Sequence, residues 1–183
     1  HARTLYQSLH PHYPNARFFV VLCDRVDGFF DPELEPFDFV YLEDLQLPNP
    51  SDMAERYNIT EFNTAVKPFA FAHLMEKYGF GSIVYLDPDL LFVDKMQELD
   101  DMLSEGAEAV LTPHILQPAE RDEVHDGKML IFGIYNLGFL ALRNTPDVRS
   151  FLSWWGRRLE RECIIRLDQG LFVDQKWADL IPA

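Results

Sequence analysis

The chain has 183 residues, of which 48% are hydrophobic, 25% are charged and 14% are aromatic. This composition excludes a disordered, collagen-like or coiled-coil protein, and the length predicts one globular domain over residues 1–183. The formal net charge of −14 argues against nucleic acid as a partner, because phosphate binding normally rests on a basic surface.

Cysteine content and hydropathy point to the compartment. The two cysteines, Cys23 and Cys163, are too few for a disulfide framework, and neither belongs to a Cys/His cluster that would bind zinc. The apolar runs have the length of strands, so no transmembrane helix is predicted, and no signal peptide is recognised. We therefore expect a reducing, aqueous location, with the cytoplasm as the default.

Apolar runs of strand length alternate with helical patterns in the first part of the chain. This alternation is typical of an α/β domain. In chain order we predict a helix over residues 2–9, strands over residues 17–23 and 37–42, and a short helix over residues 52–57.

The segment of residues 63–79 is predicted to contain a helix. Pro68 suits a first helical turn, where its missing N–H costs no hydrogen bond. Gly79 is a suitable residue for the end of the helix. Between these two residues, the apolar side chains recur at helical spacing and form one stripe: Phe71, Leu74, Met75 and Tyr78.

A short strand over residues 82–86 (SIVYL) follows this helix. A helix and a strand joined so tightly are typical of a Rossmann-like sheet, in which ligands bind at the carboxyl ends of the strands. For the remainder we predict a strand over residues 107–112, a polar loop over 113–128, two strand-like runs within 129–142, a helix that begins at Thr145-Pro146, and a short last helix through Trp177.

Asp87-Pro88-Asp89, directly after the SIVYL strand, carries the clearest chemical signal. In an extended backbone residues i and i+2 point to the same side, so both carboxylates can converge on one point. Two such carboxylates repel each other unless a cation lies between them, and oxygen ligands favour Mg²⁺ or Mn²⁺. The alternative is an acidic turn that binds no metal.

Three further features accompany this motif. Lys67 begins the preceding helix, and Tyr135-Asn136-Leu137-Gly138 and Asp168-Gln169-Gly170 follow later. In this order the chain resembles the GT-A glycosyltransferases that use nucleotide sugars, and most of all the retaining group of glycogenin and the lipopolysaccharide galactosyltransferases. The likeness runs from about Asn63 to Trp177. It implies a Rossmann-like GT-A fold, with a mixed central sheet flanked by helices.

The resemblance also implies a donor site for a nucleotide sugar, with a UDP-sugar expected. Asp89 would bind the metal directly, and Asp87 would bind the metal, the ribose or both. Lys67 would contact the donor sugar or its diphosphate. Asn136 and Gly138 would line the donor pocket, where a glycine lets the backbone approach the sugar. The expected cofactor is Mn²⁺ or Mg²⁺, which would act as a Lewis acid on the departing diphosphate.

The catalytic residues implied by the resemblance are Asp168 and Gln169. Asp168 would accept hydrogen bonds from hydroxyls of the donor sugar. Gln169 would lie on the reactive face of that sugar, where its amide oxygen would stabilise an oxocarbenium-like transition state. Transfer with retention is therefore expected, either by departure and attack on the same face or through a covalent adduct.

The chain departs from the pattern of this family at both ends. Residues 2–9 correspond to the helix that follows the first strand of such enzymes, and no histidine follows Asp168 to complete the metal site. We expect these residues to be a portion of a longer enzyme, which leaves the activity of the portion itself open.

Each site residue also has a purely structural explanation. Asp168 could cap the last helix, Asn136 and Gly138 could mark a break in a strand, and Lys67 could be a surface lysine. Arginines gather between residues 143 and 166, where they could meet an anionic acceptor or a lipid head group, although a solvated helix face is the simpler explanation.

Two other functions stay open. A strand followed by DxD also begins phosphatases of the haloacid-dehalogenase type, although Leu91 stands where they carry Thr or Ser. The other is a degenerate transferase fold that binds sugar nucleotides without catalysis. The acceptor and the oligomeric state are not indicated by the sequence.

Overall fold

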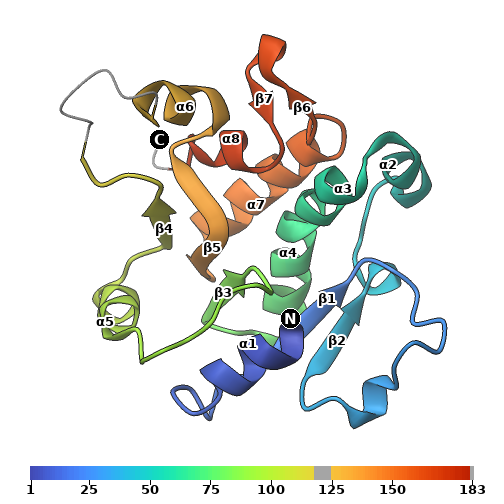
Figure 1. Ribbon diagram of the computed structural model, residues 1–183, viewed down its shortest axis with the longest axis vertical. Helices are drawn as coiled ribbons and strands as arrows, with labels where there is room; N and C mark the ends of the chain where they lie inside the picture. The colour runs from blue at the N-terminus through green and yellow to red at the C-terminus, as the bar shows by residue number, and fades with distance from the viewer. Residues whose placement is uncertain (118–124, 182–183) are drawn as a thin grey trace.

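The protein is a mixed α/β structure, shown in Figure 1 as a computed structural model that describes residues 1–117 and 125–181. Its helices are α1 (Ala2–Leu9), α2 (Pro50–Arg56), α3 (Ile59–Ala65), α4 (Lys67–Tyr78), α5 (Gln97–Glu105), α6 (His125–Phe132), α7 (Pro146–Leu159) and α8 (Gln175–Ala178). Its strands are β1 (Phe19–Leu22), β2 (Asp38–Tyr41), β3 (Ser82–Leu86), β4 (Ala109–Pro113), β5 (Tyr135–Arg143), β6 (Ile165–Arg166) and β7 (Leu171–Phe172). Short 3-10 helices are η1 (Pro32–Leu34), η2 (Leu42–Asp44) and η3 (Leu167–Gln169).

The described strands form three separate sheets. β1 and β2 pair in parallel, β5 lies between β3 and β4 in an antiparallel sheet, and β6 and β7 form an antiparallel pair. The β1–β2 pair lies to one side of the molecule, away from β4 (Figure 1). The described residues therefore do not form the single mixed sheet expected from the sequence. Among them, β1 pairs only with β2, and β3 pairs only with β5, so each of these two strands has one unpaired edge.

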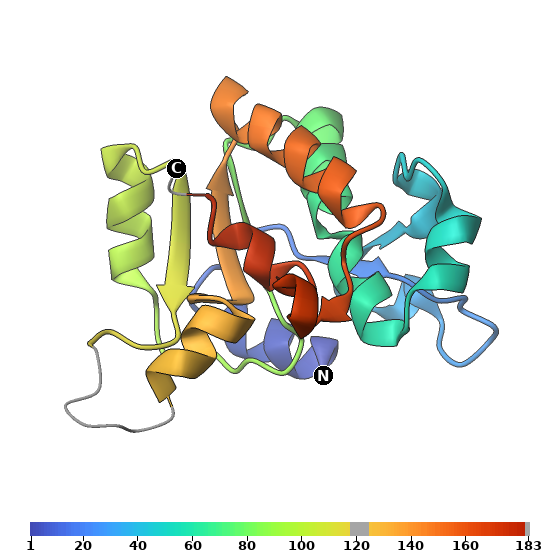
Figure 2. The ribbon, with the colours of Figure 1, turned by 90° about the horizontal axis from the view of Figure 1, so that it is seen from above.

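The core lies between helices α4 and α7 and the β3–β5–β4 sheet. Helix α7 and strand β5 pass close together in Figure 2, where α5 covers the outer side of β4. Gly156 of α7 lets α4 approach, because a Cβ there would lie 3.2 Å from Phe69 Cζ. The predicted apolar faces of both helices are buried in this core, among them Phe71, Leu74, Met75, Leu152, Trp155 and Leu159.

Several predicted elements are confirmed. The helix over residues 2–9, the strand over residues 82–86 and the helix after Thr145 lie where the sequence indicated. Thr145 caps α7 by accepting a hydrogen bond from the N–H of Val148, and Gly79 ends α4 in the left-handed conformation. No helix of the described residues is long and apolar enough to cross a lipid bilayer.

The helix predicted within residues 63–79 is confirmed as α4, with Pro68 in its first turn and Gly79 at its end. The residues before it form a separate helix, α3, and the two helices are divided at Val66. Pro68 lies in the first turn of α4 and has no N–H to bond the carbonyl of Thr64, so a continuous helix cannot pass this point. The break places Lys67 at the first position of α4, where its side chain is turned into the protein.

Predictions around residues 113–134 were partly wrong. Residues 125–128 belong to helix α6 rather than to a loop, and the run Met129–Phe132 continues this helix instead of forming a strand. A short apolar run fits a strand and a buried helix equally, so its period did not distinguish them. Residues 118–124 of the predicted loop lie outside the described residues.

Candidate functional site

The side chain of Lys67 lies where three of the four sequence motifs meet. Its Nζ donates a hydrogen bond to the carbonyl of Leu137, 3.0 Å away, and lies 2.8 Å from Asp174 Oδ2. The same ammonium lies 4.3 Å from the ring centroid of Tyr85. These contacts join the start of α4, the end of β3, the first part of β5 and the segment after β7. The alternative of a surface lysine is wrong, since Lys67 is 5% exposed.

Asp174 balances the buried charge of Lys67. An isolated ammonium away from water is costly, and a paired carboxylate together with a carbonyl offsets much of that cost. Burial raises the pKa of Asp174, while the nearby Lys67 ammonium acts in the opposite direction by stabilising the carboxylate. Asp174 itself is 1% exposed, so the pair forms part of the protein interior.

Tyr85 connects this pair to the first aspartate of the Asp87-Pro88-Asp89 motif. Its hydroxyl donates a hydrogen bond of 2.6 Å to Asp87 Oδ1. Burial raises the pKa of Tyr85, and the hydrogen bond to Asp87 raises it further, so the phenol remains protonated and can donate to the carboxylate. Asp87 directly follows β3, and its N–H still pairs with the carbonyl of Gly138, so the side chains of Tyr85 and Asp87 leave the extended backbone on the same side.

The backbone of the motif is a turn, which corrects one premise of the sequence prediction. The N–H of Leu90 donates to the carbonyl of Asp87 over 3.2 Å, so Pro88 and Asp89 occupy the middle of a turn rather than an extended segment. The rule that residues i and i+2 share a side therefore does not apply to Asp87 and Asp89. Asp87 is half-buried and Asp89 is exposed at the surface.

Strand β5 brings Asn136 and Gly138 to Asp87. The N–H of Asp87 donates to the carbonyl of Gly138 over 2.8 Å, and Asn136 Oδ1 accepts a hydrogen bond of 2.8 Å from the N–H of Gly138. The register of β4 against β5 shifts at Leu111 and Thr112, opposite this segment. At this irregular part of β5, the carbonyl of Leu137 accepts its hydrogen bond from Lys67. Asn136 and Gly138 therefore lie within β5 rather than ending it.

Asp168 and Gln169 lie apart from this group of contacts. Both are exposed in η3, between β6 and β7. Arg166 forms two hydrogen bonds of 3.0 Å with the Asp168 carboxylate, and these hold the pKa of Asp168 below its ordinary value. Asp168 does not cap the last helix either, because the N-cap of α8 is Asp174. The roles expected of Asp168 and Gln169 stay predictions.

Sequence reasoning missed a second Asp-Gln pair, Asp174-Gln175, six residues after the first. Asp174 is buried against Lys67, and Gln175 donates a hydrogen bond of 3.0 Å from Nε2 to the carbonyl of Phe132. The signal was present in the run GLFVDQKW, where a buried apolar segment leads into the second pair. Tyr85 was missed as well. It stands two residues before Asp87, a spacing that places both side chains on the same side of an extended backbone.

Asp87 and Asp89 are the residues that could hold a divalent metal. The described part of the chain contains no group of three or more His, Cys, Asp and Glu side chains arranged to bind an ion. Mg²⁺ and Mn²⁺ are commonly held by one or two carboxylates together with water and the phosphates of a substrate. The hydroxyl of Tyr85 already engages Oδ1 of Asp87. Asp87 and Asp89 supply the type of ligand that such an ion prefers, and the turn leaves Asp87 half-buried and Asp89 exposed.

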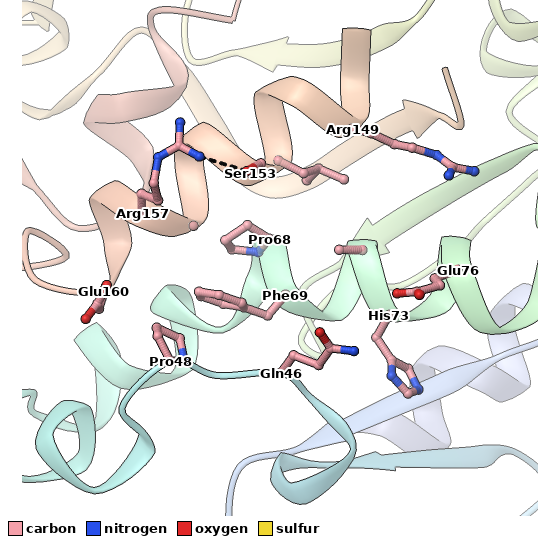
Figure 3. A pocket seen from close by; sticks show the side chains of 13 residues that line it. Gln46, Pro48, Pro68, Phe69, His73, Glu76, Arg149, Ser153, Arg157 and Glu160 are labelled. Carbon is pink, nitrogen blue, oxygen red and sulfur yellow. Dashed lines mark hydrogen bonds between the residues drawn. The ribbon is translucent and has the colours of Figure 1, made fainter. Parts of the chain in front are cut away.

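A cavity of about 360 Å³ lies elsewhere, between α4, α7 and the loop around Pro48 (Figure 3). Phe69 and Pro68 lie in its middle, and Arg149 and Arg157 lie toward opposite ends. None of the residues predicted for the site lines it. The motif residues are therefore not gathered around this cavity, and the site at the end of β3 is defined by their contacts alone.

Comparisons with protein-family models and with curated proteins found no match to the chain.

Proposed function

We propose that this chain is the donor-binding part of a metal-dependent, retaining glycosyltransferase of the GT-A type, acting on a nucleotide sugar such as a UDP-sugar. The observation that carries the proposal is the meeting of three motif segments at Lys67, namely α4, the YLDPD end of β3 and the YNLG segment of β5, together with Asp174 from the segment after β7.

The sheet arrangement supports the proposed GT-A fold if one additional strand, which the described residues do not supply, lies between β1 and β3. β1 (FVVL) and β3 (SIVYL) are continuous apolar runs, the pattern of strands that are buried on both faces. Both are nevertheless half-exposed along most of their length. A strand that paired with the open edges of both would join the β1–β2 pair and the β3–β5–β4 sheet into one mixed sheet.

In the proposed reaction Asp87 and Asp89 would hold the metal together with the donor diphosphate. When bound, the ion would supply Lewis-acid stabilisation of the departing nucleoside diphosphate. A chain with a net charge of −14 needs such a cation to hold a diphosphate against electrostatic repulsion. Asn136 orders the β5 backbone next to Asp87 through its hydrogen bond to the N–H of Gly138.

We assign the catalytic role of this proposal to Gln175, next to the buried Asp174 that positions it, with Asp168-Gln169 as the rival pair. Asp174 contacts Lys67 and lies in the same network as Asp87, whereas Asp168 pairs with the exposed Arg166. The Gln amide oxygen would stabilise positive charge at the anomeric carbon without acting as a strong nucleophile. Lys67 then orients Asp174 and Tyr85 from inside the protein, in place of contacting the donor diphosphate.

The test is metal-dependent breakdown of nucleotide sugars. We expect release of UDP from at least one UDP-sugar with Mn²⁺, its loss on chelation, and a product with the anomeric configuration of the donor by NMR. Hydrolysis of phosphate monoesters in place of UDP release would favour the haloacid-dehalogenase alternative. Metal-dependent UDP binding without release from any donor would instead indicate the degenerate, non-catalytic module.

A further inference from the structure

The carboxylate of Asp87 is held from two sides. On one side, Oδ1 accepts the 2.6 Å hydrogen bond from the hydroxyl of Tyr85. On the other side, Oδ2 lies against the backbone of Gly138, where a Cβ would be only 2.9 Å from it. Rotation of the carboxylate would break the first contact or press an oxygen into β5. One orientation is therefore favoured before any ligand binds.

Gly138 is a glycine because of this carboxylate. Its φ does not lie in the left-handed region, so the backbone conformation there suits any residue. The added Cβ would also come within 2.9 Å of Asn136 Oδ1. Space for two side-chain oxygens, and not conformational freedom, is what the position requires. This explanation differs from the sequence expectation that Gly138 serves close approach to a sugar.

Tyr85 is itself held in place by the buried pair. The Lys67 ammonium lies 4.3 Å from the centre of the Tyr85 ring, a distance typical of a cation–π contact. The Nζ of Lys67 is fixed in turn by the carbonyl of Leu137 and by Asp174. A chain of contacts thus runs from Asp174 through Lys67 and Tyr85 to Asp87, so the donated hydrogen bond has little freedom to move.

We propose that Tyr85 is a positioning residue, which presents the Asp87 carboxylate to the metal in one fixed orientation, and that Gly138 completes this seat. The inference rests on the proposed function, since the orientation of Asp87 matters only if Asp87 binds the ion. Hydrogen-bond partners of metal-binding carboxylates commonly change metal affinity by about 10-fold to 100-fold when they are removed. Tyr85 would act through Asp87 and would not touch the donor.

The experiment measures the affinity for Mn²⁺ in the presence of saturating UDP, by the electron paramagnetic resonance signal of free Mn²⁺. The two test variants are Tyr85→Phe, which removes the hydrogen bond, and Gly138→Ala, which crowds Oδ2. Tyr57→Phe is the control for the first, because the Tyr57 hydroxyl is also inside the protein but donates to the carbonyl of Leu159. Gly81→Ala is the control for the second, because a Cβ at Gly81 would have no neighbour within 4 Å.

We expect Tyr85→Phe and Gly138→Ala each to weaken Mn²⁺ binding at least about 10-fold. We expect both controls to retain the affinity of the unsubstituted chain, even though Tyr57→Phe lowers the thermal unfolding temperature. Unchanged Mn²⁺ affinity in Tyr85→Phe, in a chain whose UDP binding depends on Mn²⁺, would overturn the inference and leave the proposed function standing. Absence of Mn²⁺-dependent UDP binding in the unsubstituted chain would overturn the proposed function, and this inference with it.

Discussion

The ammonium of Lys67 and the carboxylate of Asp174 lie 2.8 Å apart, and each side chain is less than 5% exposed. The two residues are far apart in the sequence, and neither is a residue type that is normally buried. Their pairing links the start of α4 to the residue immediately before α8. The pair therefore joins two segments of the fold and supports Tyr85 at the same time.

Breaking this pair should destabilise the protein. We expect Lys67→Met to lower the free energy of unfolding by about 3–5 kcal/mol, because it leaves a buried carboxylate without a partner. The double variant Lys67→Met/Asp174→Leu should lose less than Lys67→Met alone, since both charges are then absent. Urea unfolding followed by circular dichroism measures both values. Equal stability of Lys67→Met and the unsubstituted chain would show that Asp174 does not depend on Lys67.

The two Asp-Gln pairs provide a matched comparison. We expect Gln175→Ala to reduce kcat for sugar transfer by about 100-fold or more with little change in KM, because a group that stabilises the transition state acts on the rate of reaction. Gln169→Ala, an exposed position, should leave both constants within about twofold. The reverse result, with the loss confined to Gln169→Ala, would return the catalytic role to Asp168-Gln169.

The cysteines should be unreactive in the folded protein. Burial raises the pKa of Cys23 to about 11, and burial also raises the pKa of Cys163. At about pH 8 we expect both thiols to resist alkylation by iodoacetamide and both to react in denaturant, as counted by mass spectrometry. Rapid alkylation of either cysteine in the native protein would show that it is accessible as a thiolate.

The same shift sets a dependence of stability on pH. The pKa of a cysteine thiol in the unfolded chain is about 8.5, whereas burial raises the pKa of Cys23 in the folded state to about 11. The contribution of Cys23 to the free energy of unfolding is complete below about pH 8.5 and is lost as the pH rises toward about 11. In this interval the thiol ionises in the unfolded state but not in the folded state, which favours unfolding. A variant Cys23→Ala should show a smaller decline in unfolding temperature across this interval.

The sequence predicted the elements whose signals are local. Thr145-Pro146 marked the start of α7 because capping depends on neighbouring residues, and SIVYL marked β3 because an apolar run of that length leaves few alternatives. Met129–Phe132 was misassigned because four apolar residues do not distinguish a strand from a helix. The separation of the strands into three sheets depends on pairing between distant segments, which no local pattern encodes.

The candidate site was predictable in part for the same reason. Asp87 could be recognised from the strand that precedes it, and its neighbours Asn136 and Gly138 from their short motif. The burial of Lys67 was not predictable, because its partner Asp174 lies more than 100 residues away. Choosing between two Asp-Gln pairs needs the same long-range information: only the contact with Lys67 distinguishes Asp174 from Asp168.

Calorimetric titration of UDP into the protein, with Mn²⁺ and again with a chelator, tests the central claim most directly. We expect UDP to bind only when Mn²⁺ is present, and we expect Asp89→Ala to abolish that binding while the unfolding temperature without ligand stays the same, because Asp89 is exposed in a turn. Binding of UDP that is equally tight in the chelator, or that persists in full in Asp89→Ala, would show that these aspartates do not hold a metal for a diphosphate.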